Sequence, residues 1–431
     1  MATTRRRPLA VLSLVVVLVV LAALATVLAS PGAADDHEVW VLDQGTDRIH
    51  VYDGEHTQVA SIDVSPGALR SLAPGFDPEA GATVPHMIDF DSQGRYAFVA
   101  ATAGAATLVI DAVERETVAV LETGAGSHMA AVTPDDDAVW VAAIGTEQLV
   151  EIPLDLDADE PEFAIGRHLD VGDLLADSGY EFPSDSPVCH QYTADGAEAW
   201  VTLGPGMHDG GLIAVDLDAG ELAHAWDPDE VRANCGIGFS ADGQRAIANW
   251  SGTFGADAEE VPGEYYAIDV ATYELLQTAS SDGIDAHGVR LTPDGERFWQ
   301  VNRGSDDGQV IDAETFEVIE EIPHAGVSPD ILDFSLDGSL AYVTQRGPNP
   351  LSGDPHVAAG DDPGVAVLDT ETLEIVEVLR QPEVTNGDGE VVNDVHGIGV
   401  RPATGEERVV SAAPAAAALV DGGRTLTCHL I

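Results

Sequence analysis

One short turn recurs along this chain and constrains its fold more than any other feature. It reads Pro-Asp-Gly or a close relative, and an apolar strand stands on each side of most copies. The copies are at 92–94, 134–136, 194–196, 241–243, 293–295, 336–338 and 402–405. A third strand, often ending in Asp, and a fourth strand then follow, as in 309–312 and 317–320. Four antiparallel strands repeated at roughly 42 to 66 residues predict the blades of a β-propeller.

The number of blades follows from how the ring closes. Seven units begin at His86, His128, Val188, Cys235, His287, Asp330 and His396. Residues 38–64 offer three further strands that lack a first strand, and 396–400 could supply it. The sequence therefore predicts an all-β, seven-bladed β-propeller. The tail 409–431 also resembles weak strands, so an eight-bladed ring stays open.

The N-terminus has the features expected of an export signal or membrane anchor. Arg5, Arg6 and Arg7 precede an apolar run from Leu9 to Ala29, which is long enough to span a bilayer. Positive charge before the run keeps the N-terminus inside and sends the rest of the chain outside. We expect 1–35 to be a signal peptide or membrane anchor and 36–431 to be the propeller. The body would lie on the extracellular face, either secreted or anchored by one N-terminal helix, and cleavage stays undecided.

The charge of the chain indicates where it works. It has 75 acidic and 18 basic residues, all of the latter arginine, for a formal net charge of −57. This excess repels itself in dilute buffer, and multimolar salt screens that repulsion. Such a composition is typical of haloarchaeal proteins. Nucleic acid is an unsuitable partner, because no basic patch would meet its phosphates. Membrane contact is expected only through the N-terminal segment.

Three stretches carry a resemblance to a known family. Residues 287–295 (His-Gly-Val-Arg-Leu-Thr-Pro-Asp-Gly), 310–315 and 342–345 resemble the YVTN-repeat propellers, which include YncE-like secreted proteins. The resemblance implies the propeller fold and an exported protein. Its motifs are structural, so they specify the fold far better than the function. Gln345 stands where the family usually has Asn.

Aligning the units on the turn places ligand-type residues at one position. Four histidines, one cysteine and one aspartate occur there, and the unit that begins at Val188 has His190 two residues later. Inner strands line the central channel, and His, Cys and Asp bind zinc or copper. The predicted metal ligands are His86, His128, His190, Cys235, His287, Asp330 and His396. The alternative is that each histidine only bonds a neighbouring loop. Cys189 and Cys235 could instead form a disulfide between blades.

No catalytic motif accompanies these features. The chain has no nucleophile elbow, phosphate loop or dinucleotide fingerprint. Long insertions at 168–187, 346–363 and 380–395 are where binding would be expected. We therefore predict a binding module or scaffold at the cell surface, with an unknown protein or small molecule as partner. The alternative is a copper- or zinc-dependent redox or hydrolytic enzyme that uses the histidine ring.

Overall fold

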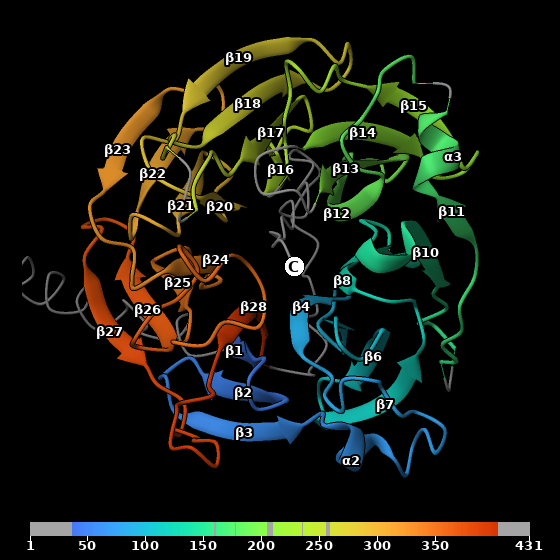
Figure 1. The fold of residues 1–431 in the computed structure, drawn as a ribbon, viewed down its shortest axis with the longest axis vertical. Coiled ribbons are helices and arrows are strands. Elements are labelled where there is room, and N and C mark those ends of the chain that lie inside the picture. The colour runs from blue at the N-terminus through green and yellow to red at the C-terminus, as the bar shows by residue number, and fades with distance from the viewer. Residues whose placement is uncertain are drawn as a thin grey trace, which may run out of the picture.

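Seven four-stranded antiparallel sheets are arranged around a central axis in the computed structural model (Figure 1). The structure describes residues 37–158, 161–176, 178–204, 210–234, 236–255 and 259–403. Each sheet is one blade, so the prediction of an all-β, seven-bladed β-propeller is confirmed. The apolar N-terminal run and the tail 409–431 lie outside the described residues. Within the described part of the chain, no helix has the length and apolar character needed to cross a membrane.

The blades follow the chain in order. Blade 1 contains β4 (Pro85–Phe90), β5 (Tyr96–Ala101), β6 (Ala106–Asp111) and β7 (Glu116–Leu121). Blade 2 contains β8 (Ser127–Val132), β9 (Ala138–Ala143), β10 (Gln148–Pro153) and β11 (His168–Asp170). Blade 3 contains β12 (Ser186–Tyr192), β13 (Glu198–Gly204), β14 (Gly211–Asp216) and β15 (Glu221–Ala225). Blade 4 contains β16 (Ile237–Phe239), β17 (Arg245–Trp250), β18 (Glu264–Asp269) and β19 (Leu275–Ser280).

The later blades have the same order of strands. Blade 5 contains β20 (Ala286–Leu291), β21 (Arg297–Asn302), β22 (Asp307–Asp312) and β23 (Val318–Ile322). Blade 6 contains β24 (Pro329–Phe334), β25 (Leu340–Gln345), β26 (Gly364–Asp369) and β27 (Ile375–Leu379). Blade 7 contains β28 (Val395–Pro402), β1 (His37–Asp43), β2 (Arg48–Asp53) and β3 (Gln58–Asp63). The short helices are α2 (Pro66–Leu69), α3 (Val171–Leu175) and the 3-10 turn η1 (Ile144–Thr146).

Blade 7 closes the ring by joining the two ends of the propeller. Strand β28 pairs with β1 in antiparallel register, with Val39 opposite Val400. Glu38 reinforces this joint, because it accepts hydrogen bonds from Arg401 and from Arg115 of blade 1. The C-terminal strand therefore completes the blade begun at the N-terminus, as the sequence predicted for a ring of seven blades.

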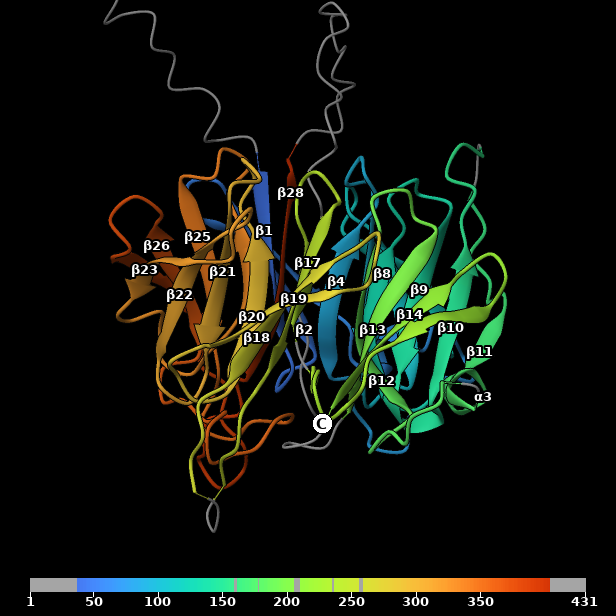
Figure 2. The ribbon, with the colours of Figure 1, turned by 90° about the horizontal axis from the view of Figure 1, so that it is seen from above.

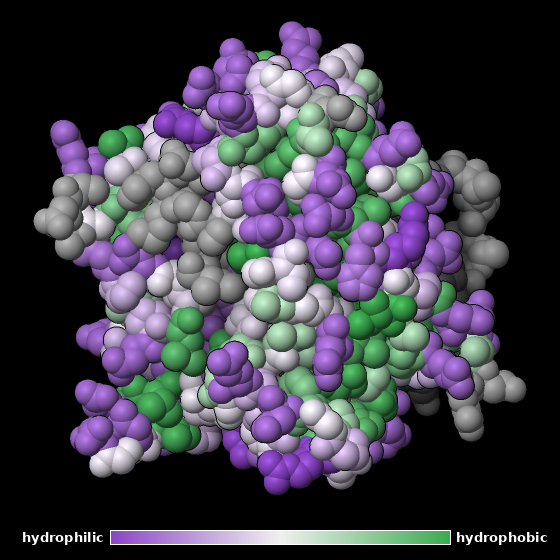
Figure 3. Space-filling view, turned by 45° about the vertical axis from the view of Figure 1, so that its right-hand side comes forward, coloured by the Kyte–Doolittle hydropathy of each residue, from purple (hydrophilic) through white to green (hydrophobic). Residues whose placement is uncertain are grey.

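The sheets are buried near the axis and exposed at the outer edge. The inner strand β4 is buried along its whole length, whereas most of β23 is exposed. Figure 2 shows β4 near the middle of the ring and β23 at its outer edge. Stacking of blade on blade covers both faces of each sheet, which explains why these strands alternate so poorly in sequence. Hydrophilic residues cover much of the face seen in Figure 3, with hydrophobic residues in smaller groups between them.

The recurring turn has a recurring set of hydrogen bonds. In blade 5, Thr292 Oγ1 donates to Asp294 and accepts from the backbone N–H of Arg297. Blades 2, 3, 4 and 6 repeat these bonds from Thr133, Thr193, Ser240 and Ser335. The final Gly295 has φ +75°, a left-handed conformation that glycine adopts without steric cost. The sequence motif is therefore a structural signal, which fixes the link between the two inner strands.

One predicted insertion is wrong in its boundaries. Residues 168–187 were expected to form a long loop, but His168–Asp170 is the outer strand of blade 2 and α3 follows it. His168 pairs with Val150 of β10. This outer strand is only three residues long and buries little surface, so it needs no long apolar run in the sequence.

Candidate functional site

A β-bulge marks the ring position in the inner strands. In blades 1, 2 and 3 the pairing skips one residue, at His86, His128 and Val188. Blades 5, 6 and 7 have shifts that span His287, Asp330 and His396 in the same way. A bulge leaves a residue out of the ladder and re-aims its side chain. The shared sequence position is therefore also a shared backbone irregularity.

Three of the predicted histidines meet at the axis. The ring of His86 lies between those of His128 and His396, with centroid separations of 4.2 and 3.8 Å. The Nε2 atoms of His86 and His128 are 2.9 Å apart, and all three side chains are fully buried. Residues from the first, second and last blades thus form one imidazole cluster.

Hydrogen bonds to carbonyls fix the tautomers in this cluster. His128 Nδ1 donates to the carbonyl of Val188 at 3.1 Å, and His396 Nδ1 donates to that of His86 at 3.0 Å. Since a carbonyl oxygen can only accept, both Nδ1 atoms carry the proton and both Nε2 atoms hold a lone pair. Burial lowers the pKa of His128 to about 3 and holds those of His86 and His396 well below 6.5. The imidazoles are therefore neutral at pH 7.

His287 and Asp330 continue the ring beside an ion-pair network. Nε2 of His287 and Nε2 of His396 each lie 4.0 Å from an oxygen of Asp330. Nδ1 of His287 lies 3.5 Å from Asp285, whose carboxylate also accepts from Arg303. Burial raises the pKa of Asp330 to about 7, against the lowering effect of Arg346 and Arg303. The neutral histidines therefore lie next to buried Asp–Arg ion pairs at the axis.

Arg346 connects this network to the insertion at the channel mouth. Its guanidinium binds Asp394 through Nε and Nη2, both at 2.8 Å, and Asp330 through Nη1 at 3.0 Å. It also donates to the carbonyl of Ser352, and the backbone of Leu351 donates to Asp394. These bonds hold residues 351 and 352 of the predicted 346–363 insertion in place.

Of the two remaining predicted ligands, only His190 lies in the described structure, and it does not join the cluster. His190 lies two residues past the bulge, in a regular ladder pair with Val201, and its ring is close to that of Tyr192. Cys235 lies outside the described residues. Cys189 is disulfide-bonded, and both other cysteines, Cys235 and Cys428, lie outside the described part. Across the residues described, no three His, Cys, Asp or Glu side chains are arranged to hold a metal ion.

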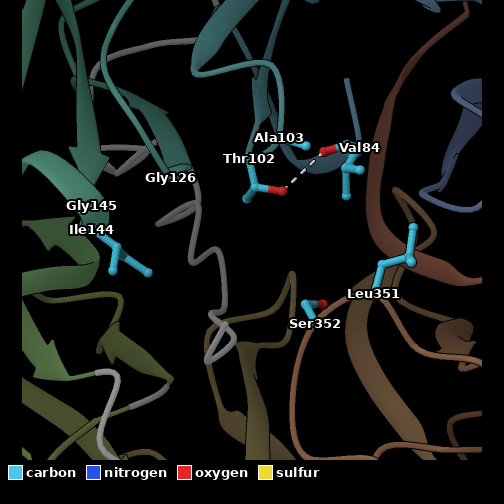
Figure 4. Close-up of a pocket in the computed structure, with 8 residues that line it drawn as sticks. All are labelled: Val84, Thr102, Ala103, Gly126, Ile144, Gly145, Leu351 and Ser352. Carbon is cyan, nitrogen blue, oxygen red and sulfur yellow. Dashed lines mark hydrogen bonds between the residues drawn. The ribbon is translucent and has the colours of Figure 1, made fainter. Parts of the chain in front are cut away.

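A cavity of about 420 Å³ lies at the mouth of the axis. Its walls come from blades 1 and 2 and from the blade 6 insertion (Figure 4). The lining residues are Val84, Thr102, Ala103, Gly126, Ile144, Gly145, Leu351 and Ser352. Val84 and Gly126 come two residues before His86 and His128, so the cavity lies at the end of the axis where the inner strands begin. Ile144 and Leu351 stand on opposite sides of it in Figure 4.

Sequence reasoning missed the arginines and two of the aspartates. Arg303 and Arg346 are fully buried and follow the second strands of neighbouring blades. A signal was present, because Asn302-Arg303-Gly304 and Gln345-Arg346-Gly347 are both amide-Arg-Gly triplets at the same place in the repeat. In a chain with so few cations, a repeated arginine next to buried strands indicates a paired charge.

The comparisons with known proteins identify the class of the fold and nothing narrower. No protein-family model matches the chain, and no curated protein matches it. Hydrazine synthase of Kuenenia stuttgartiensis is similar in structure at 12% identity and a TM-score of 0.56, covering 76% of this chain and 90% of that one. Dihydro-heme d1 dehydrogenase NirN, solved in complex with DHE, is similar at 16% identity and a TM-score of 0.50. That match covers 84% of this chain and 74% of that one. At these identities the likeness supports the propeller fold alone.

Proposed function

We propose that this chain is an exported binding module whose β-propeller holds a small molecule in the cavity at the axial mouth. The observation that carries the proposal is the cavity itself, built from segments of three blades and closed by Leu351 and Ser352. Its volume falls in the range of ligand pockets in proteins, about 300–1,000 Å³. The charges on Arg346 and Asp394 hold the closing segment in place.

The lining indicates the class of ligand. Val84, Ala103, Ile144 and Leu351 present apolar surface, and among the residues that the structure describes no ionisable side chain lines the cavity. The polar groups at its wall include the hydroxyls of Thr102 and Ser352. A compact, uncharged and largely apolar molecule with one or two hydrogen-bonding groups fits this chemistry, because a charged ligand would lose its hydration without a partner.

A neutral apolar dye tests the cavity. N-phenyl-1-naphthylamine would be titrated into the protein in multimolar NaCl, with Ala103→Phe filling the space. We expect one dye per chain and at least tenfold weaker binding to the variant. Val376→Phe adds an aromatic ring on the exposed outer strand β27 and serves as the control. Equal binding by Ala103→Phe and the unaltered chain would contradict the proposal.

The proposed location follows from the sequence. The arginines before the apolar run and the acidic, lysine-free composition support an exported, YVTN-type propeller of a salt-adapted organism. A reporter enzyme fused after Ile431 should therefore be active outside the membrane. A reporter found only on the cytoplasmic side would refute export.

The imidazole cluster favours a second candidate, a copper or zinc centre at the axis. Metal-binding histidines usually donate their other ring N–H to a carbonyl or carboxylate, as His128 and His396 do here. With bonds of about 2.0–2.1 Å, two ligands of a tetrahedral ion stand about 3.4 Å apart. The Nε2 atoms of His86 and His128, at 2.9 Å, would need to separate by about 0.5 Å. Because the required movement is small, His86 and His128 are the two ligands on which the proposed centre rests.

Metal content after purification in multimolar salt tests this candidate. His128→Ala should lower bound copper or zinc without unfolding the propeller, whereas the exposed His324→Ala should leave the metal content unchanged. Absence of stoichiometric metal from the unaltered chain after incubation with either ion would exclude the candidate and leave the binding module.

A further inference from the structure

A second group of polar side chains lies away from the axis, between blades 6 and 7. We name His37, His56, Tyr342 and Glu377 the Tyr342 cluster. Tyr342 Oη lies 2.9 Å from Nε2 of His37 and 3.1 Å from Nε2 of His56. Nδ1 of His56 lies 2.8 Å from Glu377 Oε2. The residues come from β1, the β2–β3 turn, β25 and β27, and Tyr342 is 305 residues from His37.

We propose that the Tyr342 cluster is a metal-binding site in which His37, His56 and Tyr342 are the ligands of a divalent ion such as Cu²⁺. It is independent of the axial cavity and of the axial histidines. Two imidazole nitrogens and one phenol oxygen suit copper, zinc and iron, whose usual protein ligands include imidazole.

The spacing of the donor atoms carries the proposal. Around an ion with bonds of about 2.0–2.1 Å, ligands at angles of 90–110° stand about 2.9–3.4 Å apart. The two distances from Tyr342 Oη, 2.9 and 3.1 Å, already fall in this range. Tyr342 Oη therefore already stands at a suitable distance from each imidazole nitrogen for both members of either pair to bind one ion. Because the third ligand is a tyrosine, the site lies outside sets made of His, Cys, Asp and Glu alone.

Glu377 orients one ligand in the way known from metal sites. A carboxylate that accepts from Nδ1–H of a histidine fixes its tautomer and leaves the Nε2 lone pair for the ion. Glu377 has this relation to His56, and Nε2 of His56 is directed at Tyr342. Glu377 is thus a positioning residue and not itself a ligand.

Burial and charge around the cluster also favour a cation. The side chains of His56 and Glu377 are 12% and 52% exposed, whereas Tyr342 and His37 are buried, so an ion from solvent meets His56 first. The carboxylates of Asp337, Asp333 and Glu377 lie close enough to Tyr342 to act on it electrostatically. These carboxylates make the surroundings negative, and a bound cation would offset that charge.

The turn that supplies His56 has a different residue in the other blades. His56 has a left-handed φ of +63°. Left-handed φ values of +57° to +59° occur between the third and fourth strands of four other blades, at Arg115, Tyr273, Phe316 and Leu373. Arg115 and Tyr273 reach the preceding blade and bond Glu38 and Glu198. Of these five turns, blade 7 alone has a histidine at this position, and that histidine faces the phenol of Tyr342.

Coordination would replace the phenol proton. The O–H bond of Tyr342 breaks, the oxygen forms a bond to Cu²⁺, and the proton leaves to solvent. No oxidant or reductant is required, because copper keeps its charge. The phenolate–Cu²⁺ pair gives a charge-transfer band in the visible spectrum, which histidine ligands alone do not give.

A copper titration tests the proposal. Cu²⁺ would be added to the full chain in multimolar NaCl without a chelating buffer, and binding followed by equilibrium dialysis and visible absorption. We expect one ion with the charge-transfer band, which Tyr342→Phe should abolish while binding weakens at least tenfold. Tyr265→Phe is the matched control, because Tyr265 is also buried but its hydroxyl donates to the carbonyl of Phe316. The control should keep the band.

Two further variants keep the test decisive if Tyr342→Phe folds poorly. His56→Asn preserves the left-handed turn, since Asn tolerates that conformation, and should weaken copper binding at least tenfold. Glu377→Gln should keep the band and weaken binding by about 10- to 100-fold. Absence of the band on addition of copper, or a band that survives Tyr342→Phe, would each overturn the proposal, whether or not copper also binds at the axial histidines.

Discussion

His190 gives the sharpest test of the electrostatics around the axis. Its side chain is fully buried, and within the described part of the chain neither ring nitrogen makes a hydrogen bond of good geometry. Burial lowers its pKa from 6.5 to about 4, although the backbone of Trp140 lies near enough to oppose the shift. Between about pH 4 and pH 6.5, His190 is therefore neutral in the folded chain and protonated in the unfolded chain.

The sign and size of the effect follow from proton linkage. A histidine whose folded pKa is depressed costs stability as the pH falls from about 6.5 towards 4, and the loss is complete below pH 4. At pH 5 the difference of about 1.5 pH units corresponds to about 2 kcal/mol, and at pH 7 it is close to zero. His190→Leu should remove this cost, so we expect the variant to gain about 2 kcal/mol relative to the unaltered chain on going from pH 7 to pH 5.

Urea unfolding at pH 7 and pH 5, in the same multimolar NaCl, measures this difference. Val201→Ala is the control, because Val201 pairs with His190, is equally buried and does not titrate. It should lower the free energy of unfolding by the same amount at both pH values. If His190→Leu also shifts the stability equally at both, the reasoning is refuted.

The other predictions concern charges. Arg346→Met leaves buried Asp394 without its ion pair and leaves Asp330 only the longer pair with Arg303, so the free energy of unfolding should fall by about 3–5 kcal/mol. Arg380→Met, at an exposed pair with Asp362, should cost less than about 1 kcal/mol, and urea unfolding compares the two variants. Glu38→Gln should weaken the closure of the ring by about 1.5–3 kcal/mol and speed hydrogen exchange in β28, and unchanged protection there would contradict the role given to Glu38. Dialysis from multimolar to dilute salt should unfold the body, as circular dichroism would show, because unscreened repulsion among acidic side chains opposes the compact state. Equal thermal stability in both solutions would refute the interpretation of the composition.

The repeat could be predicted from sequence because its signals are local. The turn, its flanking strands and the Asp that ends the third strand lie within a few residues of one another. Asp312, for example, accepts from the backbone N–H groups of Glu314 and Thr315, as such a turn residue should. Alignment on that turn also placed His86, His128 and His396 at equivalent positions, and ring symmetry then brought them together.

The rest depended on contacts between distant segments. Arg346 binds Asp394, which is 48 residues away, through the geometry of two adjacent blades. The Tyr342 cluster was missed because His37 and His56 share no register with the ring histidines, and only the closing blade places them beside β25. His190 was predicted to join the ring because side chains two residues apart on a strand lie on the same face. The bulge at Val188 interrupts this alternation of side chains.

The pairing of β28 with β1 also sets the order of events during biosynthesis. His37 pairs with Pro402, about 365 residues later. Strand β1, which is synthesised first, therefore cannot pair with β28 until the end of the propeller has been made. At about 5–20 residues per second this delay is roughly 20–70 seconds, during which the edge of β1 stays open. An exported chain would pass through its translocation channel in the same order. Ring closure is therefore a late step, and for an exported chain it would take place on the far side of the membrane. A ribosome stalled before residue 395 would leave an unsealed arc of blades.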